Sequence, residues 1–285
     1  MAAIVVVHGI GQQVKGPDSL AAVWVPALRD GMTAAGVPPV AADDVCVAFY
    51  GDLYRAAGKT AGTGWPPLSA ADVDSDWERL LLELWWREAA DADPAVPAPE
   101  AETKARTPRA VQRALDALSQ SAFFAGLAER AMIGTLKQVA LYFADDTLRS
   151  AVGARVAAAV SGDTRVIVAH SLGTVAAYEA VCTHPEWGVT TLVTLGSPLG
   201  IRNLVFDRLR PAPGSDGTGR WPGGVRAWSN IADSGDVVAL VKSLRPLFGD
   251  RVTDALVRNG AKAHDVLPYL TARETGEAIG RGLAG

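Results

Sequence analysis

The segment that decides the fold is Arg165-Val-Ile-Val-Ala-His-Ser-Leu-Gly-Thr174, in which an apolar run ends at a serine. Residues 165–169 are rich in β-branched side chains, which is typical of a strand buried on both faces of a sheet. Residues 175–182 carry small side chains at their start and predict a helix. A sharp strand-turn-helix passage exposes the serine hydroxyl, and the helix N-terminus behind it supplies N–H groups. We therefore expect Ser171 to be a nucleophile. The segment Ala169-His-Ser-Leu-Gly173 follows the pattern G-x-S-x-G except at its first position, where Ala169 replaces glycine and is small enough for the turn.

A second turn, His8-Gly-Ile-Gly-Gln12, follows the apolar run at residues 4–7. Attack on an acyl carbonyl needs two N–H donors for the oxyanion, and loss of one costs about 3 kcal/mol. One donor comes from the residue after the nucleophile, here Leu172, and we assign the other to Ile10. Gly9 and Gly11 are expected to line the substrate site. The turn does not predict a dinucleotide site, because the third glycine of G-x-G-x-x-G is replaced by Val14.

The chain contains four histidines, and only two of them follow Ser171. Hydrolases with this type of turn have the chain order serine, acid, histidine. His184 lies at the far end of the following helix, about 20 Å from the hydroxyl at 1.5 Å per residue. A general base must come within about 3 Å, so His264 is the predicted base. We expect His8 and His170, which precede the serine, to orient their own turns through hydrogen bonds.

Two aspartates are candidates for the acid that orients His264. The strand predicted at residues 225–229 leads into Asn230-Ile-Ala-Asp-Ser-Gly-Asp-Val-Val238. Asp236 is preferred because it follows a glycine in a turn and precedes an apolar run. Asp233 is the alternative, although it could instead form a turn or cap a helix. Asp265, next to the base, is expected to cap the final helical stretch.

Short apolar runs separated by helical patterns predict a mainly parallel sheet flanked by helices, an α/β fold. The site is then expected beyond the carboxyl ends of the strands. The strands are predicted at residues 4–7, 45–49, 165–169, 191–195 and 225–229.

Residues 51–160 predict no strand and form a large helical insertion between core segments 1–50 and 161–285. A helix is expected from Asp76 to Arg87, opening on an acidic cap, followed by a proline-rich loop at residues 93–99 and further helices over 108–160. The aromatic residues of the insertion either seal these helices onto the core or belong to a lid over an acyl pocket. The helix from Asp76 carries an apolar stripe formed by Trp77, Leu80, Leu81, Leu84 and Trp85. The aromatic residues of the later helices are Phe123, Phe124, Tyr142 and Phe143.

Three motifs carry a resemblance to a known family: Val5-Val-Val-His-Gly-Ile-Gly-Gln12, Ala169-His-Ser-Leu-Gly-Thr174 and Leu195-Gly-Ser-Pro-Leu-Gly200. Together with the late His264, they resemble lipase-like α/β-hydrolases, especially intracellular phospholipases of the DDHD group and their bacterial relatives. The resemblance implies the α/β-hydrolase fold, Ser171 as nucleophile, and residues 142–160 as the helix that precedes the nucleophile strand, part of the core. It also places Pro198 and Leu199 on the floor of the site. Ser197 is not expected to be a nucleophile, because the proline after it prevents a helix there.

Composition limits the classes of partner. The net charge is −4 and the basic residues are scattered, so nucleic acid is not an expected partner. Two cysteines are too few for a disulfide framework and lack metal-ligand spacing, which favours a cytoplasmic protein. No apolar stretch approaches the roughly 20 residues of a membrane span, although peripheral membrane contact is allowed. No metal or organic cofactor is required.

The function expected from these residues is hydrolysis of a carboxylic ester, of a lipid or another hydrophobic acyl substrate, through an acyl-enzyme. Two alternatives remain open. The same triad could transfer the acyl group to another nucleophile, as in a thioesterase, cyclase or acyltransferase of secondary metabolism, or the chain could be a non-catalytic binding protein on a hydrolase fold.

Overall fold

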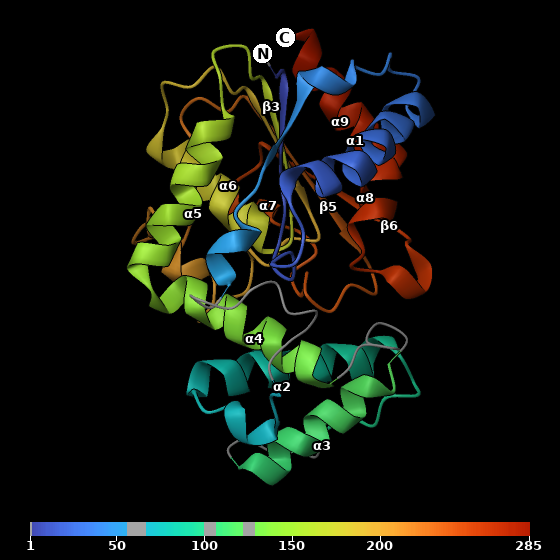
Figure 1. Ribbon diagram of the computed structural model, residues 1–285, viewed down its shortest axis with the longest axis vertical. Helices are drawn as coiled ribbons and strands as arrows, with labels where there is room; N and C mark the ends of the chain where they lie inside the picture. Colours follow the sequence, from blue (N-terminus) through green and yellow to red (C-terminus); the bar gives the residue numbers. More distant parts are fainter. Residues whose placement is uncertain (1, 56–66, 100–106, 122–128) are drawn as a thin grey trace.

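The computed structural model describes residues 2–55, 67–99, 107–121 and 129–285 (Figure 1). Its centre is a six-stranded sheet in which all neighbouring strands are parallel, in the order β2-β1-β3-β4-β5-β6. The strands are β1 (Ile4–Val7), β2 (Val45–Ala48), β3 (Val166–His170), β4 (Thr191–Leu195), β5 (Ala227–Asp233) and β6 (Val252–Val257). The predicted α/β fold with a parallel sheet is therefore confirmed.

The strand order creates a switch point inside the sheet, between β1 and β3. β1 pairs with β2 on one side and with β3 on the other, although about 160 residues separate β1 from β3 along the chain. At their carboxyl ends, Val7 lies opposite Ala169. Open α/β sheets bind ligands at such a point, because the loops that leave the two strands diverge there. The loop after Val7 and the turn at Ser171 are therefore neighbours.

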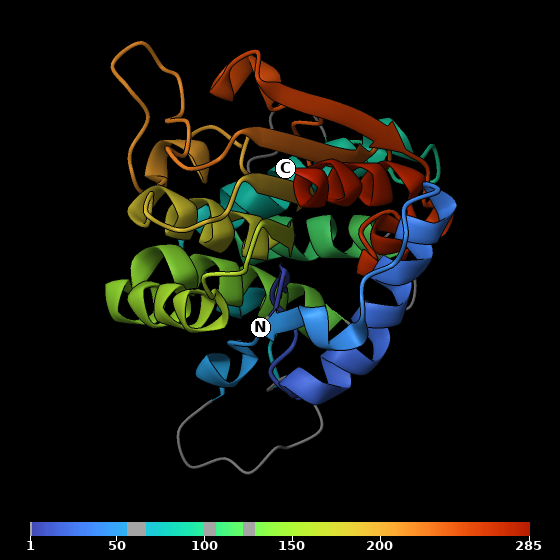
Figure 2. The ribbon, with the colours of Figure 1, turned by 90° about the horizontal axis from the view of Figure 1, so that it is seen from above.

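Helices cover both faces of the sheet (Figures 1 and 2). On one face, α1 (Pro17–Ala34), α8 (Val266–Thr271) and α9 (Arg273–Ala284) pack over the side chains of Ile4 and Val6. On the other face, α5 (Asp146–Ala159) and α6 (Leu172–Thr183) pack over Val5 and Val7. β1 is consequently buried on both faces, which explains its uninterrupted apolar sequence.

Three further helices lie at the carboxyl end of the sheet: α2 (Asp76–Ala92), α3 (Pro108–Ser119) and α4 (Glu129–Ala144) (Figure 1). The predicted helix from Asp76 is present, but its N-cap is Ser75, whose hydroxyl accepts the Glu78 N–H. Its predicted stripe is shifted: Leu82 and Trp86 are buried beside Leu81 and Trp85, whereas Leu80 is 39% exposed. The helix is apolar around most of its circumference, so spacing alone does not select the buried face.

The helices that follow α2 and the last strand of the sheet match the predictions only in part. Residues 142–160 do not form one helix, because α4 ends at Ala144 and Asp145 caps α5 through the N–H groups of Thr147 and Leu148. Tyr142 and Phe143 are buried against each other in the core, as the sealing role requires. Phe123 and Phe124 lie outside the described residues. β6 and the short helix α7 (Arg245–Phe248) were not predicted.

Candidate active site

Ser171 stands at the turn between β3 and α6, with φ 56° and ψ −133°. Positive φ is strained for a residue with a side chain, and such strain persists where the surrounding structure enforces it. Here the Ser171 N–H donates to the Leu195 carbonyl on β4 at 3.0 Å. The side chain lines a cavity at the carboxyl end of the sheet, although only 6% of the residue is exposed.

Close backbone approach explains two glycines around this turn. A Cβ on Gly9 would lie 2.8 Å from the Ser171 Cβ and 3.2 Å from its Oγ. A Cβ on Gly173 would lie 2.3 Å from the His8 carbonyl oxygen. Both contacts are closer than packed carbon atoms allow, so the loop after β1 can reach the serine only because side chains are absent there.

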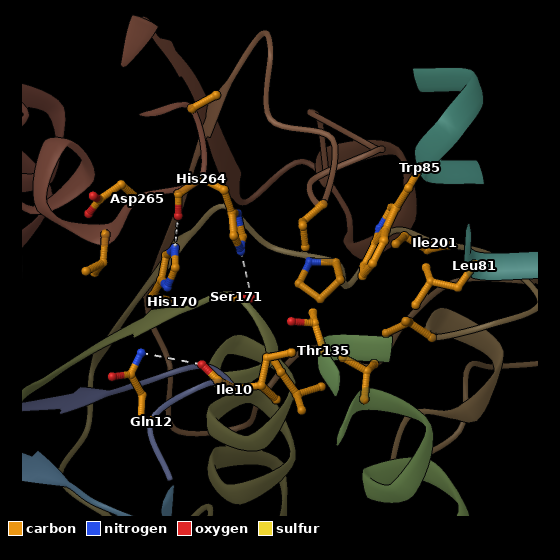
Figure 3. A pocket seen from close by; sticks show the side chains of 18 of the residues that line it. Ile10, Gln12, Leu81, Trp85, Thr135, His170, Ser171, Ile201, His264 and Asp265 are labelled. Atoms are coloured by element: carbon orange, nitrogen blue, oxygen red, sulfur yellow. Dashed lines mark hydrogen bonds between the residues drawn. The ribbon is translucent and has the colours of Figure 1, made fainter. Parts of the chain in front are cut away.

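His264 lies beside the serine hydroxyl (Figure 3). Its Nε2 is 2.9 Å from Ser171 Oγ, and its Nδ1 is 2.8 Å from Asp236 Oδ2. Because the carboxylate accepts a hydrogen bond from Nδ1–H, the ring proton stays on Nδ1, and Nε2 can accept the proton of Ser171. The segments around Ser171, Asp236 and His264 thus converge at the carboxyl ends of the strands.

Asp236 is fully buried and held by several donors. Its Oδ1 accepts the N–H groups of Val238 and Ala239 at 2.9 and 3.2 Å. Its Oδ2 accepts from His264 and, at 2.8 Å, from the Tyr269 hydroxyl. Burial alone would raise the pKa of Asp236, but His264 and these hydrogen bonds outweigh burial and bring that pKa below its ordinary value. Asp236 is therefore a buried carboxylate that remains ionised beside the imidazole.

Asp233, the alternative acid, has a different environment. Its Oδ1 accepts the Gly235 N–H at 2.7 Å, and its Oδ2 accepts the Asn259 N–H. The carboxylate therefore joins the end of β5 to the loop before His264 and does not contact the imidazole in the described hydrogen bonds. Asp265 caps α8 by accepting the Leu267 N–H at 3.0 Å, as its position predicted.

Tyr269 is a site residue that the sequence did not indicate. Its hydroxyl accepts the Asp233 N–H at 2.7 Å and donates to Asp236 Oδ2, so one side chain on α8 connects the two aspartates. Gly196, at φ 54°, gives the room for this cluster, since a Cβ there would lie 2.7 Å from Asp236 Oδ2. No local motif marks Tyr269, because its partners lie more than 30 residues away in sequence.

Ile10 and Leu172, the predicted oxyanion donors, both line the cavity beside Ser171. Leu172 is the first residue of α6, where helix geometry leaves the N–H without an intrahelical acceptor. Within the described part of the chain, neither amide donates to a protein acceptor. The two N–H groups are consequently available to a ligand oxygen next to the serine.

His8 and His170 hold the two turns in place. Tyr50 N–H donates to His8 Nε2 at 3.0 Å, so the other ring nitrogen donates to the Gly9 carbonyl. His170 Nε2 lies 2.9 Å from the His264 carbonyl oxygen (Figure 3). Burial lowers the pKa of His8 to about 4 and that of His170 to about 3, so both rings are neutral at pH 7. His184 lies at the far end of α6 and contacts Glu186, away from the cavity lining.

The cavity has a volume of about 480 Å³ and continues from Ser171 between the sheet and helices α2 and α4. Its wall is largely apolar beyond the serine (Figure 3). Gly9 and Pro198 belong to the lining as predicted, whereas Gly11 and Leu199 are not part of it, and Leu199 is fully buried. Ser197 is also buried, with its hydroxyl bonded to Thr174 Oγ1 at 2.8 Å. The apolar wall comprises Leu81, Trp85, Val139, Ile201, Val205 and Val238.

Within the described ranges, no helix is long and apolar enough to cross a bilayer, and no cluster of three or more His, Cys, Asp or Glu side chains has the arrangement of a metal site. Comparisons with protein-family models, with curated proteins and with solved structures find no match to this chain.

Proposed function

We propose that this chain is a serine hydrolase of the α/β-hydrolase type that cleaves a carboxylic ester of a hydrophobic acyl group. The observation that carries the proposal is the continuous line of hydrogen bonds from Ser171 Oγ through His264 to the buried Asp236. Nucleophile, base and orienting carboxylate follow three different strands in the chain order that such hydrolases use. A structural serine would require neither the strained turn nor the open cavity in front of the hydroxyl.

The mechanism follows from these positions. Ser171 Oγ bonds to the acyl carbon while His264 Nε2 takes its proton, and the N–H groups of Ile10 and Leu172 hold the oxyanion. The C–O bond to the alcohol breaks as His264 returns the proton to the leaving oxygen. A water molecule, deprotonated by His264, then attacks the acyl carbon and frees the serine. Asp236 keeps the imidazole in the required tautomer and stabilises its charged form.

The cavity supports a hydrophobic acyl group as the substrate class. Its volume lies within the usual range for small-molecule sites, and its apolar wall on α2 and α4 begins next to the serine. An acyl chain bound along this wall would present its carbonyl to the hydroxyl. Polar acyl groups would lose hydration against this largely apolar wall, so hydrophobic acyl esters are favoured.

The experiment combines turnover with covalent labelling of purified protein. We expect hydrolysis of p-nitrophenyl acyl esters and labelling by a fluorophosphonate probe, both lost in Ser171→Ala. Ser197→Ala is the matched control, since it removes a nearby hydroxyl that is already bonded to Thr174. Labelling that persists in Ser171→Ala would refute the assignment of the nucleophile. Wild-type protein that neither turns over nor labels would favour a binding function, and acyl transfer to an added amine or alcohol in preference to water would indicate a transferase.

A further inference from the structure

Gln138 is a buried polar residue of α4 whose hydrogen bonds lead to the loop after β1. It is only 7% exposed. Its Oε1 accepts the Gly11 N–H at 2.9 Å, and its Nε2 donates to Gln13 Oε1 at 3.2 Å. These partners precede Gln138 by more than 120 residues. A core-facing amide on a helix has a desolvation cost unless it is fully bonded, so its two contacts define where this helix and this loop fit together.

The contact lies one residue from the proposed oxyanion donor. Gly11 follows Ile10 directly and has φ 76°, a conformation that glycine adopts without strain. The peptide between Ile10 and Gly11 is held at both ends, since its carbonyl accepts Gln12 Nε2 at 3.4 Å and its N–H donates to Gln138. Without Gln138, the glycine would allow this peptide to rotate, and the backbone of Ile10 would lose the anchor on its carboxyl side. The Ile10 N–H lies in the preceding peptide and shares the Ile10 Cα, so its position beside Ser171 would no longer be fixed.

The same helix also forms part of the cavity wall. Thr135 and Val139, three residues before Gln138 and one after it, both line the cavity (Figure 3 labels Thr135 beside Ile10). One helix therefore contacts the space for the acyl group and holds the loop that carries an oxyanion donor. A shift of α4 would change both together.

We infer that Gln138 is a positioning residue that fixes the Ile10 N–H for the oxyanion, acting from the helical insertion on the reaction at Ser171. This inference rests on the proposed hydrolase function. It predicts an effect on the chemical step and not on substrate binding, because the oxyanion exists only after attack has begun. Misplacement of a donor by about 1 Å can cost roughly 100-fold in rate.

The test compares kcat and KM for a p-nitrophenyl ester across variants of Gln138. In Gln138→Met, a residue of similar size, we expect kcat to fall about 10- to 100-fold with KM changed less than about twofold. Gln138→Glu restores an acceptor for the Gly11 N–H and should recover most of the lost kcat. Gln112→Met on α3 is the control, because that amide bonds Asp116 and Glu129 outside the cavity lining.

The outcomes separate the inference from the proposed function. A wild-type kcat in Gln138→Met, or an equal loss in Gln138→Glu, would overturn the role of Gln138 while leaving the hydrolase intact. A wild-type protein without turnover or Ser171 labelling would overturn both. If circular dichroism finds Gln138→Met unfolded, Gln138→Asn takes its place: its amide is one methylene too short to reach Gly11, so the same kcat loss is expected, and unchanged kcat would refute the inference.

Discussion

Replacing Asp236 by asparagine tests the hydrogen bonds that join Ser171, His264 and Asp236, because it changes the atom that faces His264 Nδ1. Asp236 Oδ1 accepts two backbone N–H groups, from Val238 and Ala239. In Asp236→Asn the side-chain oxygen must take this position, because an NH₂ group cannot accept these donors. The new NH₂ then faces His264 Nδ1, where Oδ2 stood. It can only donate, so Nδ1 must become the acceptor and the ring proton moves to Nε2.

The size of the effect follows from this forced tautomer. With a proton on Nε2, His264 cannot take the proton of Ser171. In serine hydrolases with this arrangement the equivalent change lowers kcat about 10⁴-fold, or about 5 kcal/mol of barrier. The backbone bonds to the side-chain oxygen remain, so we expect the folded structure to persist and KM to change little.

The assay is steady-state hydrolysis of a p-nitrophenyl ester, together with the rate of fluorophosphonate labelling. Asp233→Asn serves as the matched control, since Asp233 also accepts two backbone N–H groups but does not contact His264 in the described hydrogen bonds. We expect this control to lose stability, by about 1–3 kcal/mol, and to keep kcat within a few-fold of wild type. A kcat for Asp236→Asn within tenfold of wild type, or a larger loss in Asp233→Asn, would refute the assignment of the acid.

Three further predictions concern the surroundings of this site. Tyr269→Phe removes a donor to Asp236 and leaves the buried Asp233 N–H unpaired, so the free energy of unfolding in urea should fall by about 2–5 kcal/mol and kcat by about tenfold. Gly9→Ala would push its Cβ into Ser171, so fluorophosphonate labelling should slow at least 10-fold. The pKa of His8 lies near 4 in the folded protein but near 6.5 when unfolded, so the unfolded chain binds the extra proton as the pH falls between these values. The free energy of unfolding of the wild type therefore falls as the pH is lowered through this window. Between pH 6.5 and 4.5, urea unfolding should show a fall about 2 kcal/mol smaller for His8→Asn than for wild type.

Tyr178→Phe removes a hydroxyl bonded to the Arg220 carbonyl and should lower stability by about 1 kcal/mol without changing kcat. An equal kcat in both tyrosine variants would remove Tyr269 from the site. Gly16→Ala enters open space and should label like wild type. Identical pH dependence in wild type and His8→Asn would show that folding does not lower the pKa of His8.

The sequence predicted the sheet where strands are fully buried. β1 and β4 have the predicted limits, because every side chain in them is buried and both sequences consist of aliphatic and β-branched residues. β6 was missed since it lies at the edge of the sheet, where only Val252 and Val257 are buried and the residues between them are partly or fully exposed. Its sequence, Val-Thr-Asp-Ala-Leu-Val, therefore lacks the run that identifies a buried strand.

The sequence predicts those site residues that a local motif, the order along the chain or the length of a helix can identify. Ser171 has a local motif, and His264 follows from the exclusion of His184 by helix length. Tyr269 and Gln138 have no such signal, because each acts through a side-chain contact that exists only after distant segments have packed. A tyrosine or glutamine in an amphipathic helix has the same sequence pattern whether or not it serves a site.

The pairing of β1 with β3 has a consequence for synthesis of the protein. Ile4 pairs with Val166, so β1 cannot acquire this neighbour until the roughly 160 residues between the two strands have also left the ribosome. Closing so long a loop precedes the gain from the contacts it brings, which makes formation of this central pair a slow step of folding. An emerging chain can pair β1 with β2 but leaves its other edge open, and that edge of a strongly apolar strand needs protection from aggregation until β3 emerges.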